Sequence, residues 1–269
     1  MHIVFWSCMP GHGNVTSNLL SIACNCAAYQ RYFTSVLQTQ FKKNNLQYPF
    51  FKIEDKANVE QYNSVGMDSL VRAIKGGSIS GGIETAAVSF MNSKLSVYTQ
   101  STNFDGKAYY NSLMQTMPQM MKSLDATFDL SFIDTAGGND PVSFEALKNA
   151  DYIVICLPQE QWIVNYQFSK YQFEASKVFY LIGNYDPKSV ITLKSLQKSK
   201  AFKGKFTSKN CAYIAHDIDF ANALSTSDLE SFFIRGMNCK PSNPNYEYFK
   251  SVHEATKKLL TFVGITPRK

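Results

Sequence analysis

The sequence predicts an α/β fold, in the form of a single three-layer α/β/α domain with a mostly parallel sheet. Short apolar runs typical of strands alternate with segments whose apolar residues recur at helical spacing, and this alternation implies βαβ units. The 269 residues contain no internal repeat, no low-complexity linker and no break in composition. We therefore expect one domain over residues 1–269.

The expected elements begin with a strand at 2–8, a glycine-containing turn, a helix at 14–29 and a short strand at 35–40. Residues 41–65 are polar and irregular and are expected to form an exposed excursion. Later strands are expected at 95–98, 128–134, 152–157, 177–182 and 212–215, and later helices at 67–74, 109–124, 144–149, 161–173, 191–198 and 246–262. Pro118 is expected to kink or interrupt its helix.

Composition places the chain among globular proteins, because 45% of its residues are hydrophobic and 18% are charged. The formal net charge is +6, with a mild concentration of lysines over 188–209. A nucleic-acid footprint is normally denser and interleaved with aromatic residues or glycine. A solvated basic face is therefore the preferred interpretation, and an acidic partner, DNA or a membrane surface is the alternative.

The six cysteines form no CxxC pair. Cys8 and Cys156 lie in apolar strand-like runs, which indicates reduced, buried thiols in a cytoplasmic protein. Cys24 and Cys26 are two residues apart on a predicted helix and cannot hold a metal together. The apolar N-terminal run has no basic leader, and no uncharged stretch approaches the ~20 residues that span a bilayer. Peripheral association with the inner face of the membrane stays open.

The segment Met9-Pro10-Gly11-His12-Gly13-Asn14-Val15-Thr16-Ser17 lies between a predicted strand and a predicted helix. In an open parallel sheet, ligands bind at the carboxyl ends of the strands. Glycines let main-chain N–H groups approach an anion, and a helix N-terminus adds partial positive charge. The alternative is a tight turn in which Asn14 or Thr16 caps the helix.

A second loop follows the most apolar strand, which ends in Asp134 and continues as Thr135-Ala136-Gly137-Gly138. A carboxylate there can hold a metal-bound water, and the glycines let main-chain amides reach toward a phosphate. The two loops in this order are more specific than either alone. By contrast, the glycine-rich segment 76–82 follows a helix and lacks a Lys-Ser/Thr ending, so we interpret it as a flexible turn.

With both loops in place, the chain resembles the ParA/MinD superfamily of deviant Walker ATPases, a group of P-loop proteins that includes the pilus-localisation proteins TadZ and CpaE. The resemblance spans nearly the full length and is closest over 128–138. The matching segments are 3–23, Phe128–Gly138, Ala150–Pro158, Tyr180–Asp186 and Ala212–Asp217.

This resemblance implies that ATP or ADP is bound, with Mg²⁺, between the two loops. Asp134 is the implied catalytic residue, and Thr16 and Asp134 are the implied metal ligands. His12 is either a phosphate donor or an exposed loop histidine, and His216 either edges the adenine or caps a strand. The implied nucleotide-binding residues are Gly11, His12, Gly13, Asn14, Val15, Thr16, Ser17, Gly137 and Gly138 on the phosphate side and Asn184, His216 and Asp217 on the adenine side.

The chain departs from the family at its charged positions. The family loop reads KGGxGKTT, which places Met9 at the lysine that reaches across the dimer and Asn14 at the phosphate lysine. Val15 then stands at the Mg²⁺-binding Ser/Thr. The second strand ends as Leu37-Gln38-Thr39-Gln40, without the acidic residues that help to activate water. These charges act mainly on the transition state, so their loss should cost hydrolysis more than binding.

The resemblance therefore predicts a nucleotide-binding or pseudo-ATPase scaffold that positions a pilus, secretion, partitioning or division assembly through protein partners, as a monomer or homodimer. One alternative is a slow, active ATPase that dimerises on DNA or membrane and takes a lysine from elsewhere, such as Lys42 or Lys188. Another is a structural interaction protein without nucleotide. The helix at 246–262 is expected to cover the sheet, with a membrane-lying amphipathic anchor as the alternative.

Overall fold

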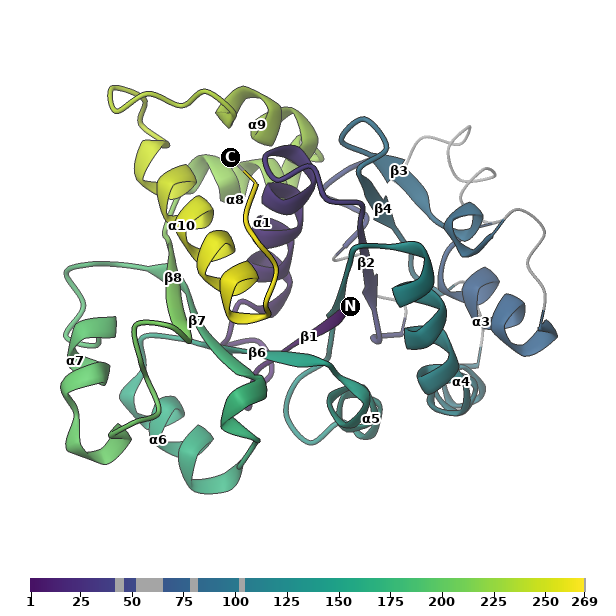
Figure 1. Ribbon diagram of the computed structural model, residues 1–269, viewed down its shortest axis with the longest axis horizontal. Helices are drawn as coiled ribbons and strands as arrows, with labels where there is room; N and C mark the ends of the chain where they lie inside the picture. The colour runs from purple at the N-terminus through teal and green to yellow at the C-terminus, as the bar shows by residue number, and fades with distance from the viewer. Residues whose placement is uncertain (42–45, 52–64, 78–81, 102–104, 269) are drawn as a thin grey trace.

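The computed structural model describes residues 1–41, 46–51, 65–77, 82–101 and 105–268 (Figure 1). Within them, eight strands form one sheet in the order β3-β4-β2-β5-β1-β6-β7-β8. All neighbouring strands are parallel except β3 and β4, which are antiparallel. The expected fold class, an α/β domain with a mostly parallel sheet, is confirmed.

The strands are β1 (His2–Trp6), β2 (Thr34–Gln38), β3 (Val88–Phe90), β4 (Leu95–Val97), β5 (Leu130–Asp134), β6 (Tyr152–Leu157), β7 (Val178–Tyr185) and β8 (Cys211–Ala215). The α-helices are α1 (Val15–Ala28), α3 (Met67–Gly76), α4 (Gly106–Thr127), α5 (Pro141–Asn149), α6 (Gln161–Lys170), α7 (Leu193–Lys198), α8 (Ile218–Thr226), α9 (Leu229–Gly236) and α10 (Tyr246–Phe262). Short 3₁₀ turns lie at Ile83–Ala86, Ala175–Lys177 and Lys200–Phe202.

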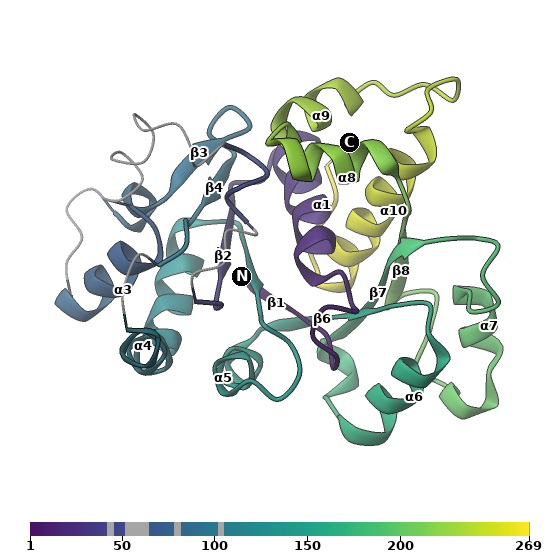
Figure 2. The same cartoon turned by 180° about the vertical axis from the view of Figure 1, so that it is seen from behind.

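Two helical layers cover the two faces of the sheet, as the opposite views in Figure 1 and Figure 2 show. Side chains alternate along a strand, so β1 sends Ile3 and Phe5 into one core and Val4 and Trp6 into the other. The first core includes α1, α8, α9 and α10, and the second includes α3, α4, α5, α6 and α7. Both faces of β1 are therefore fully buried.

The expected strands and helices are present with shifted ends, and the structure contains three further short elements that were not predicted. Strand β3 and helices α8 and α9 have no counterpart in the sequence-based prediction. Helix α4 runs through Pro118 without a break. Pro118 is exposed, so water can reach the carbonyl that lost its helical partner there.

The excursion expected at 41–65 is only partly described, since 42–45 and 52–64 lie outside the described residues. Where it is described, the expectation of exposure is wrong for Leu46, Phe50 and Phe51, which are buried. All three belong to the core beneath α1 and α9. The glycine-rich turn expected at 76–82 is described only at its ends, because 78–81 lie outside the described residues.

Helix α10 covers the sheet, as expected, because Phe249, Val252, Leu259 and Leu260 are buried against it. Five of the six cysteines are buried and none forms a disulfide. No described helix combines the length and apolarity needed to cross a membrane.

His253 on α10 is half-buried. Its Nδ1 atom is buried and has no hydrogen-bond partner among the described residues. Burial lowers the pKa of His253, the nearby Lys257 lowers it further, and Glu254 opposes the shift.

Because of this lowered pKa, we expect the free energy of unfolding to decrease as the pH is lowered. Between the folded-state pKa of His253 and its ordinary value of about 6.5, the unfolded chain binds more protons than the folded one. The loss begins as the pH falls through about 6.5. His253→Gln should flatten this part of the stability profile, measured by urea unfolding at pH 7.5 and 5.5. Lys257→Gln should give an intermediate slope, and an unchanged slope in His253→Gln would contradict the assignment.

Candidate functional site

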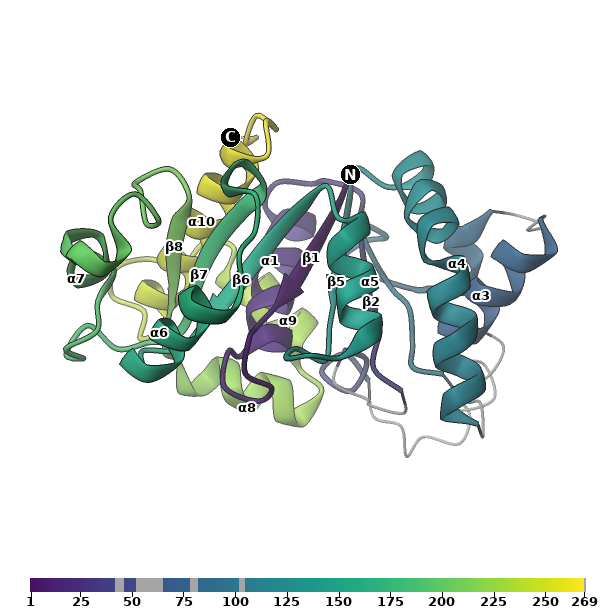
Figure 3. The same ribbon diagram turned by 90° about the horizontal axis from the view of Figure 1, so that it is seen from below.

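The candidate site lies where β1 and β5 end side by side. Phe5 pairs with Asp134 in the parallel register, so the loop that follows β1 starts next to the Asp134 carboxylate. Asp134 is fully buried, and Oγ1 of Thr16 donates a hydrogen bond of 2.8 Å to its Oδ2. The two predicted loops therefore share the carboxyl edge of the sheet, close to α8, as the lower edge of the sheet in Figure 3 shows.

The loop before α1 is built around glycines and one left-handed asparagine. Gly11 has φ +81° and Asn14 has φ +51°. Gly13 is packed so tightly that an added Cβ would lie 2.5 Å from the Cβ of Ser7 and 2.8 Å from the carbonyl oxygen of Cys156. Asn18 in the first turns of α1 donates from Nδ2 to the carbonyl of Gly13 at 3.0 Å.

The capping alternative for this loop is wrong. Asn14 occupies the N-cap position of α1 but makes no side-chain cap hydrogen bond. Thr16 binds Asp134 instead. The N–H groups of the first helical turn therefore have no side-chain cap.

Two adjoining cavities open at this edge and share Asn14 and Ser17. The first has a volume of about 240 Å³ and lies against both predicted loops. The second has a volume of about 280 Å³ and lies between α1 and α8. The first is lined by Ser7, Pro10, Gly11, Asn14, Val15, Thr16, Ser17, Gln40, Thr135, Ala136 and Gly137. The second is lined by Asn14, Ser17, Asn18, Ser21, Asn184, Ile214, Ala215, His216, Asp217, Phe220, Ala221 and Leu224.

Nine of the predicted nucleotide-binding residues line these cavities. On the phosphate side they are Gly11, Asn14, Val15, Thr16, Ser17 and Gly137, and on the adenine side Asn184, His216 and Asp217.

The other three predicted residues lie outside both linings. Gly13 is buried inside the loop. Gly138 donates its N–H to the carbonyl of Ser7 at 2.8 Å and packs against Pro10. The exposed ring of His12 is turned toward Glu160, with 3.4 Å between His12 Nδ1 and Glu160 Oε1.

The polar residues on the predicted adenine side contact one another. Oδ1 of Asn184 lies 2.5 Å from Nδ1 of His216, and Asn184 has a left-handed φ of +51° at the irregular end of β7. Asp217 caps α8 by accepting the N–H of Phe220 at 2.8 Å, and it also accepts from Asn245. Asp217 therefore has a structural role at the cavity wall.

No lysine or arginine is among the described residues that line the two cavities. Lys188, one of the two lysines considered as substitutes, lies in the loop after β7 and is in neither lining, while Lys42 lies outside the described residues. Within the described part of the chain, an anion in the first cavity would be met by main-chain N–H groups and by the hydroxyls of Ser7 and Ser17, because the Thr16 hydroxyl hydrogen is donated to Asp134.

The sequence reasoning missed several residues that shape the site. Ser7, Gln40 and Ser21 line the cavities, and Gln40 donates from Nε2 to the carbonyl of Thr135 at 3.2 Å. Asn18 fills the space that Gly183 leaves open, where an added Cβ would lie 2.3 Å from Asn18 Oδ1. Asn18 directly precedes the apolar pair Leu19 and Leu20 in the first turns of α1, and this position was the signal that could have identified it.

The thiols near the site are unsuited to nucleophilic chemistry. Burial raises the pKa of Cys156 to about 12, although a hydrogen bond from Asn18 opposes the shift. Burial raises the pKa of Cys8 to about 11. Both thiols therefore remain protonated near neutral pH, and a protonated thiol is a poor nucleophile because the thiolate is the reactive form.

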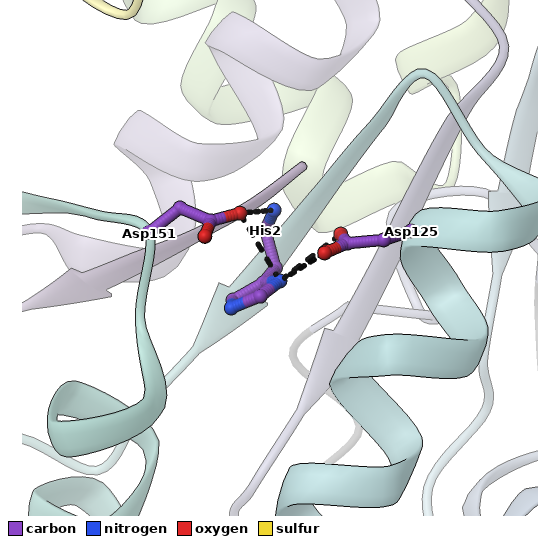
Figure 4. A group of neighbouring side chains, drawn as sticks. All are labelled: His2, Asp125 and Asp151. Atoms are coloured by element: carbon purple, nitrogen blue, oxygen red, sulfur yellow. Dashed lines mark hydrogen bonds and ion pairs between the residues drawn. The ribbon is translucent and has the colours of Figure 1, made fainter.

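A separate ionic cluster lies at the opposite, amino edge of β1 (Figure 4). Nδ1 of His2 lies 2.9 Å from Oδ2 of Asp125 and 3.3 Å from Oδ2 of Asp151, and its Nε2 lies 2.7 Å from the carbonyl oxygen of Asn149. Both ring nitrogens of His2 lie within hydrogen-bond distance of oxygen atoms. One ligand atom from each side chain lies within 4.8 Å of the others, but these contacts within the cluster already engage the His2 ring. We assign this cluster a structural role.

Comparisons with known proteins add evidence at the level of the fold. No family model matches the chain, and no curated protein is significantly similar to it in sequence. Three solved structures illustrate the structural likeness. A ParA family ATPase from Chlorobium tepidum TLS matches with a TM-score of 0.63 and 13% identity, covering 95% of this chain and 98% of the other.

The second, the septum site-determining protein MinD from Pyrococcus horikoshii OT3 complexed with Mg-ADP, matches with a TM-score of 0.64 and 14% identity over 98% of this chain and 97% of MinD. The third, the ATP complex of a single-residue variant of Cyanothece McdA, matches with a TM-score of 0.61 and 14% identity over 100% of this chain and 98% of McdA. The resemblance to ParA and MinD proteins is thus confirmed for the fold over nearly the whole chain.

The packing around Gly13 predicts that a single methyl group disrupts the loop. Gly13→Ala should destabilise the protein by about 1–3 kcal/mol because the added Cβ collides with Ser7 and with the main chain of Cys156. Gly76→Ala is the matched control, since an added Cβ there meets no atom within 4 Å and Ala is the better helix former. Urea unfolding of both variants is the measurement, and equal stabilities would contradict the packing described.

Proposed function

We propose that the whole chain acts as one ParA/MinD-like P-loop domain that binds an adenine nucleotide and serves as a positioning scaffold with little or no hydrolysis. The observation that carries this proposal is the pair of cavities joined at Asn14 and Ser17. One cavity offers an uncapped helix N-terminus and hydroxyls, which suit phosphates. The other lies between Asn184, His216 and the apolar side chains of α8, which suit a base.

Asp134 and Thr16 are the oxygen donors that would hold Mg²⁺ beside the phosphates. Their oxygens are 2.8 Å apart, and carboxylate, hydroxyl and water oxygens are the ligands that Mg²⁺ takes. When bound, Mg²⁺ supplies positive charge that offsets the phosphates. Asp134 is fully buried beneath the first cavity and lines neither cavity, so its hydrogen bond with Thr16, which does line the first one, connects the carboxylate to the proposed metal position.

The missing cation explains why we propose weak binding and little turnover. A charge-assisted hydrogen bond contributes about 1.5–3 kcal/mol, and about 1.4 kcal/mol corresponds to a tenfold change in affinity. Lack of the phosphate lysine thus weakens binding by about 10- to 100-fold. Hydrolysis suffers more, because cations at the phosphates act most strongly on the charge that develops in the transition state.

The scaffold role rests on likeness to proteins that position other assemblies. The similar structures include a septum site-determining MinD, and another is a MinC:MinD complex from Aquifex aeolicus. The sequence resemblance to TadZ and CpaE extends the proposal to pilus or secretion machinery. We propose that this chain binds protein partners of such an assembly, with nucleotide or a second copy of the chain as the regulator, in the cytoplasm or at the inner face of the membrane.

Restoring a lysine should strengthen nucleotide binding. We expect the wild-type chain to bind Mg²⁺-ATP with a Kd on the order of 10⁻⁴ M and Asn14→Lys to bind about tenfold more tightly, both measured by isothermal titration calorimetry. Ser208→Lys adds the same charge before β8, at the amino edge of the sheet, and should leave the affinity unchanged. A lysine in a left-handed conformation costs ~1 kcal/mol of stability, so thermal unfolding must confirm that Asn14→Lys folds.

Absence of binding by the folded wild type at millimolar nucleotide would leave only the structural interaction protein. Phosphate release above the protein-free rate that disappears in Asp134→Ala would instead favour the slow ATPase.

Thr16→Val should remove the benefit of Mg²⁺ without removing the nucleotide site. The valine keeps the volume of Thr16 but cannot donate to Asp134 or contact the metal. ADP affinity without metal should therefore stay within about twofold, while its increase on adding Mg²⁺ should shrink by about tenfold. Thr261→Val is the matched control, since Thr261 is exposed on α10 and its hydroxyl donates to the carbonyl of Lys257 rather than to any described residue of the candidate site. Equal Mg²⁺ dependence in both variants would refute the metal assignment.

A further inference from the structure

A larger cavity lies at the other end of α1 from the nucleotide site. It has a volume of about 510 Å³ and is enclosed by the end of α1, the turn between β3 and β4, the end of α9 and the C-terminal segment. These elements lie together in the upper part of Figure 1. Its lining residues are Ala27, Ala28, Arg31, Met91, Asn92, Lys94, Ile234, Met237 and Arg268. We propose that this cavity binds a small amphipathic organic anion, with a carboxylate or phosphate head and an apolar chain.

The head group is inferred from three cations that share the cavity. Arg31, Lys94 and Arg268 line it, and its described lining includes no carboxylate. None of the three takes part in an ion pair among the residues that the structure describes. The carboxyl end of α1 attracts positive charge through the helix dipole. All three residues are exposed, so water solvates their charges when the cavity holds no ligand, and an anionic head group could pair with all of them at once.

Within the described residues, Arg268 is held in position by uncharged groups. Its Nη1 donates to the carbonyl of Arg31 at 2.9 Å, and its guanidinium lies 4.1 Å from the centre of the Tyr32 ring. Its main-chain N–H donates to Oε1 of Gln30 at 2.6 Å. A guanidinium fixed through one nitrogen keeps its other donors available for a carboxylate or phosphate.

One wall of the cavity is shaped by an unusual turn. Met91, Asn92 and Ser93 are consecutive residues with φ values of +54°, +52° and +62°, a conformation that costs energy for residues other than glycine. The turn is tied to α9 because Oε1 of Glu230 accepts the N–H of Met91 at 2.5 Å. Strained, well-anchored turns of this kind are found at ligand-binding positions. Glu230, a carboxylate close to the cavity, is thus engaged with the main chain.

The apolar body of the occupant is inferred from side chains at the rim. Ile234 and Met237 are 53% and 44% exposed, although both lie beside the cavity. An alkyl chain that covers them would remove apolar surface from water. The volume falls in the range of small-molecule pockets, which favours one amphiphile over a length of peptide.

The proposed site is independent of the nucleotide site. The two share no lining residue within the described part of the chain, and the 14-residue helix α1 separates them by about 20 Å. Its failure would leave the proposed nucleotide function untouched, and the reverse also holds.

The test uses the full chain and sodium dodecanoate below its critical micelle concentration, titrated by calorimetry. We expect saturable binding of one dodecanoate per chain, with dodecyl phosphate comparable and dodecyltrimethylammonium at least tenfold weaker. Inorganic phosphate, which has the charge without the chain, should also bind at least tenfold more weakly. The comparison of carboxylate with phosphate identifies the preferred head group.

Three variants locate the site. Arg31→Asn keeps a residue that tolerates φ +55°, and together with Lys94→Gln it should weaken dodecanoate binding at least tenfold. Ile234→Ser should weaken it several-fold without loss of stability. Lys122→Gln, an exposed position on α4 on the opposite face of the sheet, should change nothing. Equal binding of the cationic amphiphile, full binding by the Arg31→Asn/Lys94→Gln variant, or absence of binding would each overturn the proposal.

Discussion

The parallel pairing of β1 with β5 is the constraint on which the candidate site depends. Their register brings Asp134 level with Phe5, and the loop after β1 must then pass over the end of β5. Both faces of β1 are buried, so a slip of one residue would exchange the side chains of its two cores. The hydrogen bond between Thr16 and Asp134 ties the first turn of α1 to the same point. The geometry of the cavities thus follows from sheet register.

Helix α1 links the two candidate binding sites through its polarity. Its amino end, uncapped by a side chain, presents main-chain N–H groups to a cavity whose described lining holds no lysine or arginine. Its carboxyl end lies beside three cations. The partial charges of a helix favour an anion directly at the first end and recruit basic side chains at the second. One helix therefore carries main-chain anion donors at its amino end and basic side chains near its carboxyl end. Salt should screen the side-chain cations more than the enclosed main-chain groups.

The sequence predicted the sheet well and the site in part, for physical reasons. Strands such as Tyr152–Leu157 are continuous apolar runs, because a parallel sheet buried on both faces leaves no polar alternation. Strand β3 escaped prediction because none of its three residues is fully buried and because it depends on pairing with β4. Helices α8 and α9 are short and expose the apolar side chains of Ile218 and Ile234, which blurs the helical spacing of their apolar residues. Phe50 and Phe51 are buried by partners distant in sequence, which no local pattern reveals.

At the site, the sequence identified the strand ends and the loop between β1 and α1, because glycines follow one apolar run and a carboxylate ends another. It could not show which way side chains turn. His12 points toward Glu160 because the loop presents it to solvent, and Gly13 serves packing because Ser7 and the main chain of Cys156 close over it. The hydrogen bond from Asn18 to the Gly13 carbonyl depends on the folded loop, which the sequence does not show.

The central place of β1 in the sheet has a consequence for synthesis. Its two neighbours, β5 and β6, begin at Leu130 and Tyr152, so β1 stays unpaired until the long segment between it and β5 has been synthesised. At typical rates of translation this interval is on the order of ten seconds. Long-range parallel pairing is also intrinsically slow to form. During that time an apolar strand and its glycine loop are exposed together, which makes the nascent chain a natural client for chaperones that shield unpaired strands.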